Sequence, residues 1–290
     1  MHTVSPSPEF LIIGAMKAGT TTLYRDLEQH PQIFLPQEKE PETLVRFGDD
    51  SAAMTDDYRS LFRGAKNGQL KGEASTAYTK RPTHEGAAER AFRLCGPDLK
   101  LIYLMREPVA RMVSHYRHEF GLHETDLGMD EAFDRESRYY DYGRYAFQLE
   151  PWQARFGASS FLFMRFEEYV ADRRKALEHV CAFLGIDPAL LPEPEEGKAF
   201  NKSDGKPVAL GLTGRFVRSG LYQRGIKRAV PRAVREKAMS VLLPKARNAD
   251  GQISDAKRSQ LAARFAAEPP PPDISPAFAS LAPSHSSTLG

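Results

Sequence analysis

The sequence predicts an α/β fold, in which a central, mostly parallel sheet is flanked by helices. Short apolar runs alternate with longer amphipathic segments through the first two thirds of the chain, as strands and helices do around a parallel sheet. A short, glycine-bearing loop joins the first apolar run to the segment after it. The 290 residues, of which 41% are hydrophobic, can bury the core of one large domain.

The individual elements follow from the local patterns. Four segments are predicted as strands, at residues 10–13, 70–73, 101–105 and 161–164. Apolar positions that recur one turn apart predict helices, at residues 21–29, 85–94, 109–120, 144–156 and 174–184. Beyond Pro192, closely spaced glycines indicate loops and short helices laid over the sheet.

One domain is expected over residues 1–267. Residues 268–290 are rich in proline and serine and almost without charge, so a disordered tail is expected there. No internal repeat divides the chain further.

The overall charge excludes several classes of partner. Lysine and arginine number 40 against 38 acidic residues, and a formal charge of +2 argues against broad attraction to nucleic acid or to a membrane surface. Two cysteines, Cys95 and Cys181, are too few for a disulfide framework or a cysteine-rich metal site. No apolar stretch approaches the roughly 18 residues of a membrane span. We therefore expect a cytoplasmic protein with no metal, no nucleic-acid partner and no integral membrane segment; its oligomeric state is not predicted.

The loop from Gly14 to Thr21 is suited to holding phosphate. It follows a strand and opens a helix, where backbone N–H groups and the helix dipole face outward together. Against the ATP-type pattern G-x-x-x-x-G-K-[ST], both glycines and the final threonine fit, but Thr20 stands in place of the lysine. The lysine is at position 17 instead. Such a loop suits a 5′-phosphosulfate better than the γ-phosphate of ATP with its magnesium ion.

The segment FLIIGAMKAGTTTLYRDLEQHPQIFLPQEKEP resembles the 5′-phosphosulfate-binding region of sulfotransferases that use 3′-phosphoadenosine-5′-phosphosulfate (PAPS). The resemblance implies a P-loop-like three-layer sandwich and PAPS as donor, with 3′-phosphoadenosine-5′-phosphate (PAP) as product and no metal. It also implies that the lysine contacts the bridging oxygen and that the loop holds the 5′-phosphate. The implied donor-binding residues are Lys17, Ala18, Gly19, Thr20, Thr21 and Thr22.

A second anchor follows the strand at 101–105. Arg106 stands at the strand end and Ser114 lies in the next helix, which Pro108 is suited to begin. A guanidinium and a hydroxyl together can neutralise and orient a ribose phosphate. The spacing resembles the 3′-phosphate-binding region of the same family. Because the ends of parallel strands meet at one edge of a sheet, both anchors are expected to form one nucleotide site.

Sulfuryl transfer needs a base that takes the acceptor's proton, opposite a cation that stabilises the leaving phosphate. Lys17 is the expected cation. Glu73 lies in a Glu-x-Ser-x-x-Tyr pattern that resembles the base-bearing segment of heparan sulfate-type sulfotransferases, which makes it the expected base. His118, four residues after Ser114, should share its helix face and remains an alternative base. His115 should face elsewhere and serve packing.

A third region is expected to close over the nucleotide. Phe200, Lys202 and Lys206 lie in a lysine- and glycine-containing segment that resembles a late loop of the family. The lysines could meet the 3′-phosphate, and the aromatic ring could stack on adenine. After Lys39-Glu40-Pro41 the chain departs from relatives, which commonly continue with histidine and aromatic residues.

The sequence therefore predicts a metal-independent sulfotransferase that acts on a hydroxyl or amine, with a small-molecule or glycan acceptor and a preference for a carbohydrate or glycolipid. Two alternatives remain at this point. A P-loop nucleotide kinase would need ATP and magnesium, and a non-catalytic nucleotide-binding protein would keep the loop without turnover. The sequence does not distinguish O- from N-sulfation.

Overall fold

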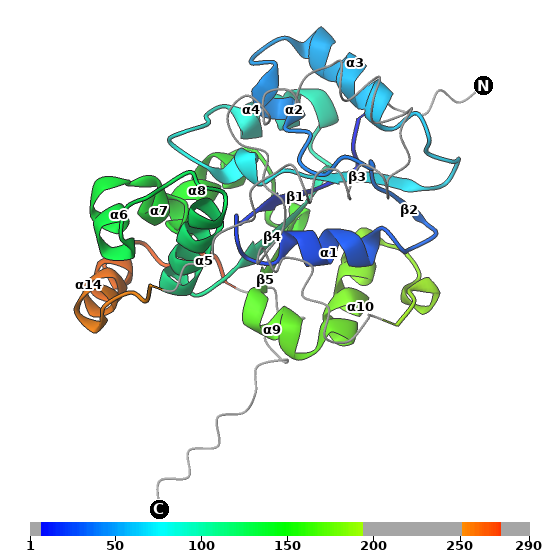
Figure 1. Cartoon of the computed structure of the whole chain (residues 1–290). Coiled ribbons are helices and arrows are strands. Elements are labelled where there is room, and N and C mark those ends of the chain that lie inside the picture. The colour runs from blue at the N-terminus through cyan, green and yellow to red at the C-terminus, as the bar shows by residue number, and fades with distance from the viewer. Residues whose placement is uncertain (1–6, 194–250, 274–290) are drawn as a thin grey trace, which may run out of the picture.

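The structure is a computed structural model and describes residues 7–193 and 251–273. At its centre lies a five-stranded sheet in the order β2-β3-β1-β4-β5 (Figure 1), and every strand pair in it is parallel. The strands are β1 (Phe10–Gly14), β2 (Ile33–Phe34), β3 (Leu70–Ala74), β4 (Lys100–Met105) and β5 (Phe161–Arg165). The predicted α/β fold with a parallel sheet is thus confirmed.

Helices cover the sheet on both sides. In Figure 1, α1, α9 and α10 lie below the sheet, α2, α3 and α4 lie above it, and α5, α6, α7 and α14 form a group at its left. The bounds are α1 (Thr20–Leu27), α2 (Thr43–Arg46), α3 (Ser51–Leu61), α4 (Ala87–Cys95), α5 (Pro108–Gly121), α6 (Met129–Arg135), α7 (Arg138–Asp141), α8 (Tyr145–Gln153), α9 (Phe166–Ala171), α10 (Arg173–Leu184) and α14 (Asp255–Ala266). Short 3-10 turns lie at η1 (Thr76–Thr79), η2 (Ala158–Ser160) and η3 (Pro188–Leu190).

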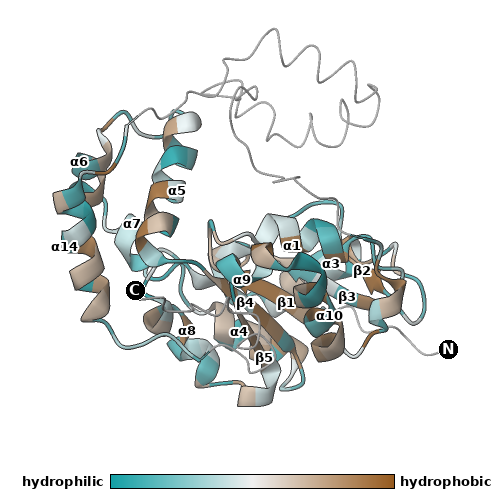
Figure 2. Ribbon diagram, turned by 90° about the horizontal axis from the view of Figure 1, so that it is seen from below, coloured by the Kyte–Doolittle hydropathy of each residue, from teal (hydrophilic) through white to brown (hydrophobic). Residues whose placement is uncertain are grey.

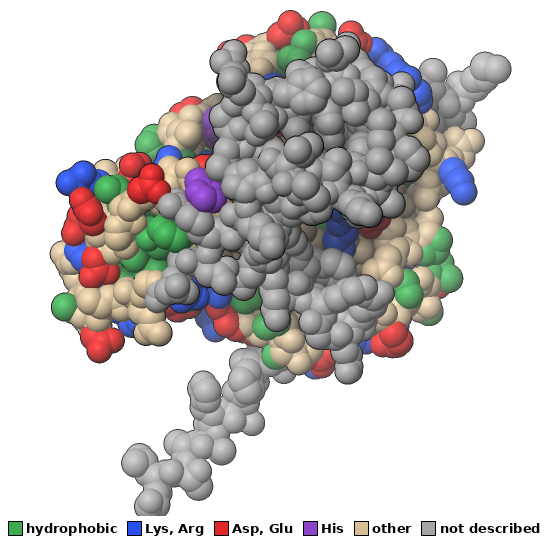
Figure 3. All heavy atoms as spheres, viewed as in Figure 1, with side chains coloured by type: hydrophobic (Ala, Val, Ile, Leu, Met, Phe, Trp, Pro, Cys, Tyr) green, Lys and Arg blue, Asp and Glu red, His purple; other side chains and the backbone are tan. Residues whose placement is uncertain are grey.

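Strands β1, β4 and β5 are largely apolar because both faces of the sheet are covered, whereas β3 carries the buried Lys71 and Glu73. All five residues of β1 are buried, and β1, β4 and β5 form the brown centre of Figure 2. A second apolar cluster lies apart from the sheet, between α5, α6, α7 and α14, and includes Met112, Phe133 and Leu261. On the surface over the α5–α7 and α14 group, acidic and basic side chains are interspersed (Figure 3), in keeping with the small net charge.

The register of the sheet brings three strand ends to one edge. Ile12 of β1 pairs with Ala74 of β3, and Gly14 pairs with Tyr103 of β4. The chain therefore leaves β1, β3 and β4 on the same side, and each of these exits carries a residue singled out by its sequence pattern.

Several elements were not predicted. The strand β2 has two residues, and α3 buries only Met54 and Tyr58. Helix α14 lies in the region where loops and short helices were expected, and Ser254 caps it by accepting from the Lys257 N–H at 3.2 Å. Glu268, at the start of the predicted tail, contacts Arg144 at 3.0 Å. Within the described ranges, no helix is both long and apolar enough to cross a bilayer.

Candidate active site

A cavity of about 570 Å³ opens at the edge where β1, β3 and β4 end. It gathers side chains from the loop after β1, from the segment before α2, from η1, from α5 and from the start of α9. The lining residues are Met16, Lys17, Gly19, Thr20, Thr21, Thr22, Lys39, Glu40, Thr76, Arg106, Ser114, His118 and Phe166.

The loop after β1 owes its shape to two residues with positive φ. Lys17 has φ 68°, a conformation that residues with a side chain seldom adopt, and Gly19 has φ 90° as the N-cap of α1. A β-carbon on Gly19 would come within 2.7 Å of the Phe166 ring, so glycine is required for space as well as conformation. Thr20, Thr21 and the residue after them form the first turn of α1, whose outward N–H groups favour an anion.

Lys17 lies in the cavity beside other charges. Its pKa is lowered to about 8, chiefly by burial; the charge of Glu40 opposes the shift and the charge of Arg106 contributes to it. The lysine is thus mostly protonated at neutral pH but is close to titrating. Ala18, in contrast, is fully buried in the core and contributes only its backbone to the loop.

Arg106 connects the two halves of the predicted nucleotide site. Its Nη1 donates to the carbonyl oxygen of Lys17 at 3.3 Å, and its guanidinium lies over the Phe166 ring, 4.8 Å from the centroid. Ser114 lines the same cavity from the second turn of α5. The structure therefore brings together the two anchors that the sequence places 89 residues apart, Lys17 and Arg106.

His118 also faces this cavity, one turn after Ser114. Burial, together with the charge of Lys17, lowers its pKa to about 4, so the ring is neutral at pH 7 and can accept a proton. His115 does not line the cavity. It is buried against the rings of Tyr139 and Tyr142, and its Nε2 lies 3.0 Å from Glu119.

Glu73 lies outside the lining of the cavity. It is fully buried in β3, and three hydroxyl groups donate to it: Tyr78 at 2.5 Å, Ser75 at 2.8 Å and Tyr58 at 3.2 Å. Burial raises its pKa to about 7, although these hydrogen bonds oppose the shift. The carboxylate is thus enclosed by its own donors within the core.

The carboxylate that does line the cavity is Glu40, which sequence reasoning missed. Its N–H donates to the carbonyl of Ala74 at 2.9 Å, which fixes it beside the end of β3. Its carboxylate pairs with Lys39 at 2.7 Å and accepts from Thr76 at 3.4 Å. Burial alone would raise the pKa of Glu40, but the charge and hydrogen bond of Lys39 bring it below the usual range. The available signal was the charged Lys39-Glu40 pair, which begins five residues after the last residue of β2.

Phe166 is a second lining residue that the sequence analysis did not single out. Three candidates cannot be placed, since Phe200, Lys202 and Lys206 lie outside the described residues. No group of three or more metal-ligating side chains occurs in the part of the chain that the structure describes.

Comparison with known proteins gives a consistent result. The sulfotransferase domain model matches residues 7–203. Mouse heparan sulfate glucosamine 3-O-sulfotransferase 3B1 is 29% identical over 224 residues, which cover 71% of this chain and 55% of that protein. Human heparan sulfate glucosamine 3-O-sulfotransferase 6 is 32% identical over 197 residues, 62% of this chain and 52% of that protein. The chain thus spans about half the length of these relatives.

A solved structure agrees as well. The sulfotransferase from Alicyclobacillus acidocaldarius is 30% identical, with a TM-score of 0.57, over 67% of this chain and 87% of that one. The domain match covers well over half of the chain, and the P-loop-like sheet carries the cavity at the expected edge. This chain belongs to the sulfotransferase family.

Proposed function

We propose that this protein transfers a sulfuryl group from PAPS to a hydroxyl or amine of an acceptor. The observation that carries the proposal is the content of one cavity: a lysine-bearing phosphate loop, an arginine–serine pair and the Glu40 carboxylate line it together. A donor with a 3′-phosphate and a 5′-phosphosulfate needs two separate anion sites, with the reacting sulfuryl group on the far side of the 5′-phosphate.

In this proposal the donor occupies both anchors. The N–H groups and hydroxyls of Thr20 and Thr21 hold the 5′-phosphate at the start of α1. The guanidinium of Arg106 and the hydroxyl of Ser114 hold the 3′-phosphate. Phe166, which lies against Arg106, offers an aromatic surface for the purine.

The transfer itself is an in-line displacement. The acceptor oxygen or nitrogen bonds to sulfur as the bond from sulfur to the bridging phosphate oxygen breaks. The acceptor's proton goes to a protein base, and the negative charge that grows on the leaving phosphate is stabilised by the ammonium of Lys17. The products are the sulfated acceptor and PAP.

We assign the base to Glu40. Its carboxylate lines the cavity, and Lys39 keeps its pKa low, so it is ionised at neutral pH and can accept a proton. The neutral ring of His118 is the remaining candidate on the same cavity. Glu73, in contrast, has no exposed surface and is enclosed by three hydroxyl donors, which supports a structural role.

A carbohydrate is the acceptor class that we favour. Support comes from the relatives, which are heparan sulfate glucosamine 3-O-sulfotransferases. The lysines at positions 17 and 39 add positive charge to the cavity, which would favour an anionic glycan. The cytoplasmic location and the single domain over residues 1–267 stay predictions.

The kinase alternative is not favoured, because the domain match is to sulfotransferases and Thr20 stands where the ATP-type loop has its lysine. A non-catalytic binding protein would hold PAP without turnover. We expect titration calorimetry to give PAP binding that is unchanged when magnesium is removed and is weakened in Lys17→Ala. Binding of ATP with magnesium in place of PAP would refute the proposal.

Turnover is tested separately. The purified protein with PAPS should release PAP when glucosamine-containing oligosaccharides are added, at a rate above the rate without acceptor. Release of PAP only with a small phenol would refute the carbohydrate preference but retain the sulfotransferase activity. PAP binding without turnover on any acceptor of either class would favour the non-catalytic alternative.

A further inference from the structure

Tyr145 contacts the nucleotide site from behind. It is the first residue of α8, is 5% exposed and does not line the 570 Å³ cavity. Its hydroxyl makes two hydrogen bonds to the main chain of a single residue: it accepts from the N–H of Arg106 at 3.1 Å and donates to the carbonyl of Arg106 at 2.6 Å. A single hydroxyl therefore holds both the N–H and the carbonyl group of Arg106 in place.

Tyr145 contacts the chain at the junction between strand β4 and helix α5. Pairing of β4 with β5 ends at Met105, and Glu107 is already the N-cap of α5. Arg106 lies between these two elements, with its guanidinium in the cavity. Because the side chain of Arg106 is long, a small rotation of its main chain would displace the guanidinium by a larger distance. The Tyr145 hydroxyl restrains that rotation.

Tyr145 is itself held rigidly. Its ring lies edge-on to the ring of Tyr103, with centroids 5.9 Å apart, and Tyr103 packs so closely on Gly14 that a β-carbon there would approach within 2.5 Å. Burial raises the pKa of Tyr145 to about 12, which keeps its proton available for donation. Tyr145 thus contacts Arg106 directly, and the ring of Tyr103 connects it to Gly14, the first residue of the phosphate loop.

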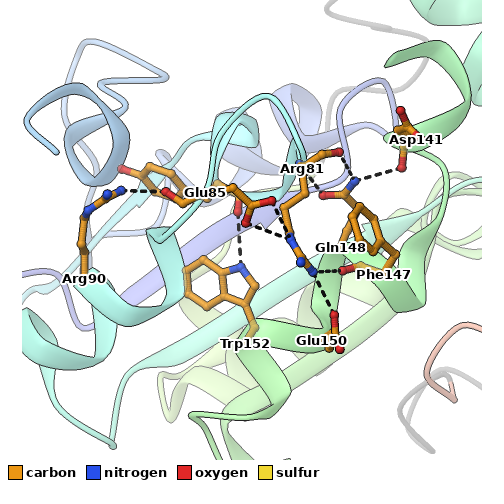
Figure 4. A network of polar contacts seen from close by, with 9 residues as sticks. Arg81, Glu85, Arg90, Asp141, Phe147, Gln148, Glu150 and Trp152 are labelled. Atoms are coloured by element: carbon orange, nitrogen blue, oxygen red, sulfur yellow. Dashed lines mark hydrogen bonds and ion pairs between the residues drawn. The ribbon is translucent and has the colours of Figure 1, made fainter. Parts of the chain in front are cut away.

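Helix α8 is fastened on another side by Gln148 (Figure 4). This fully buried amide accepts from the N–H of Arg81 at 2.8 Å, and donates to the carbonyl oxygens of Arg81 at 2.8 Å and Asp141 at 2.9 Å. One turn later, the indole N–H of Trp152 donates to the Tyr78 carbonyl at 3.3 Å. These hydrogen bonds hold α8 in position, and Tyr145 is its first residue.

We propose that Tyr145 is a positioning residue of the nucleotide site, which holds the Arg106 main chain so that its guanidinium meets the 3′-phosphate. The inference rests on the proposed function, because it takes Arg106 to bind that phosphate. The Tyr145 hydroxyl bonds to Arg106 and not to the phosphate loop, so the effect should fall mainly on affinity for the 3′-phosphate.

The variant Tyr145→Phe removes only the hydroxyl, and Tyr142→Phe is the matched control. Tyr142 lies three residues earlier, is also buried, and bonds to Thr83 at 2.6 Å rather than to Arg106. Titration calorimetry would compare PAP with 5′-AMP, which lacks the 3′-phosphate. We expect Tyr145→Phe, which loses both hydrogen bonds to Arg106, to raise the Kd for PAP about three- to tenfold. The Kd for 5′-AMP should change less than twofold, and Tyr142→Phe should change neither value by more than that.

A double-mutant cycle with Arg106→Ala tests the path of the effect. On that background, Tyr145→Phe should cause little further loss, because the group that it positions is absent. Hydrogen exchange at the Arg106 amide should be faster in Tyr145→Phe and unchanged in Tyr142→Phe. Equal losses for PAP and 5′-AMP, additive losses with Arg106→Ala, or unchanged PAP affinity would each refute the inference. If the unsubstituted protein fails to bind PAP, the proposed function itself fails.

Discussion

The clearest quantitative prediction concerns Glu73→Gln. Glutamine keeps the shape of the side chain and can accept from Tyr58 and Tyr78 through its oxygen, as the Glu73 Oε1 does now. Its amide would face Ser75, which already accepts from the Glu42 N–H at 3.0 Å and has a second lone pair to offer. The hydrogen-bond cost should therefore be about 1 kcal/mol.

The electrostatic effect is larger and depends on pH. Burial raises the pKa of Glu73 to about 7 from its ordinary 4.5, which corresponds to about 3 kcal/mol at 1.36 kcal/mol per pH unit. Between these two pH values the folded protein binds more protons than the unfolded chain, so the stability of the native protein falls as pH rises. Glutamine has no proton to lose, and the variant lacks this fall.

Urea denaturation at pH 5 and pH 8 measures the difference directly. At pH 5 the two proteins should differ by less than about 0.5 kcal/mol, because the unfolded carboxyl is already mostly ionised there and the resulting loss of native stability offsets most of the hydrogen-bond cost. At pH 8 Glu73→Gln should be more stable, by about 2 kcal/mol, or several degrees in Tm. A stability difference that is the same at both pH values would refute the reasoning. Turnover with PAPS should change less than about tenfold; a loss of 10²–10⁴-fold would instead identify Glu73 as the base.

Three further predictions concern the cavity itself. Glu40→Gln should lower kcat by about 10²–10⁴-fold while the Kd for PAP changes less than about threefold, and steady-state kinetics with an unchanged kcat would point to another base. Because burial lowers the pKa of Lys17 to about 8, the PAP affinity of the free enzyme should fall as pH rises from 7 to 9; titrations in Lys17→Ala should lack this fall, and a fall of the same size there would contradict the assignment. Gly19→Ala should weaken PAP binding and lower Tm, because the residue has φ 90° and its β-carbon would lie 2.7 Å from the Phe166 ring. Gly48→Ala is the control: Gly48 has φ 55° and nothing within 4 Å of the added β-carbon, so this variant should show the effect of backbone strain alone.

Strands β1, β4 and β5 could be predicted because strands that are covered on both faces are mostly apolar, and such runs are visible without any tertiary information. The same argument could not find β2, whose two residues have no period, or α3, whose sequence is mostly polar and buries only Met54 and Tyr58. Helix α8 ends at Gln153 rather than residue 156, with Pro151 inside its last turn. The ends of elements depend on contacts that a local pattern does not contain.

The candidate site could likewise be predicted from the sequence only in part. Lys17 and Arg106 follow strands that are adjacent and parallel, so their meeting could be predicted from strand ends alone. The burial of Glu73 outside the cavity lining depends on the side chains packed around β3, which its local pattern does not contain. Glu40 lies between β2 and α2, in a segment that the structure describes without a strand, so no strand period indicates where its side chain points. Glu40 reaches the cavity through a backbone bond to Ala74, a pairing across 34 positions that no local pattern indicates.

Helix α14 has a consequence for where the folded unit ends. The sulfotransferase domain match stops at residue 203, yet Leu261 and Phe265 fill the apolar cluster against α5, the helix that carries Ser114 and His118. A shortened chain that ended at the boundary of family similarity would leave Met112 and its neighbours facing water, and would favour self-association during expression. Fragments designed for crystallisation or for domain fusion should therefore retain the chain through residue 268, where Glu268 contacts Arg144. The region of sequence similarity therefore ends before the packed part of the chain does, because the packed part includes α14.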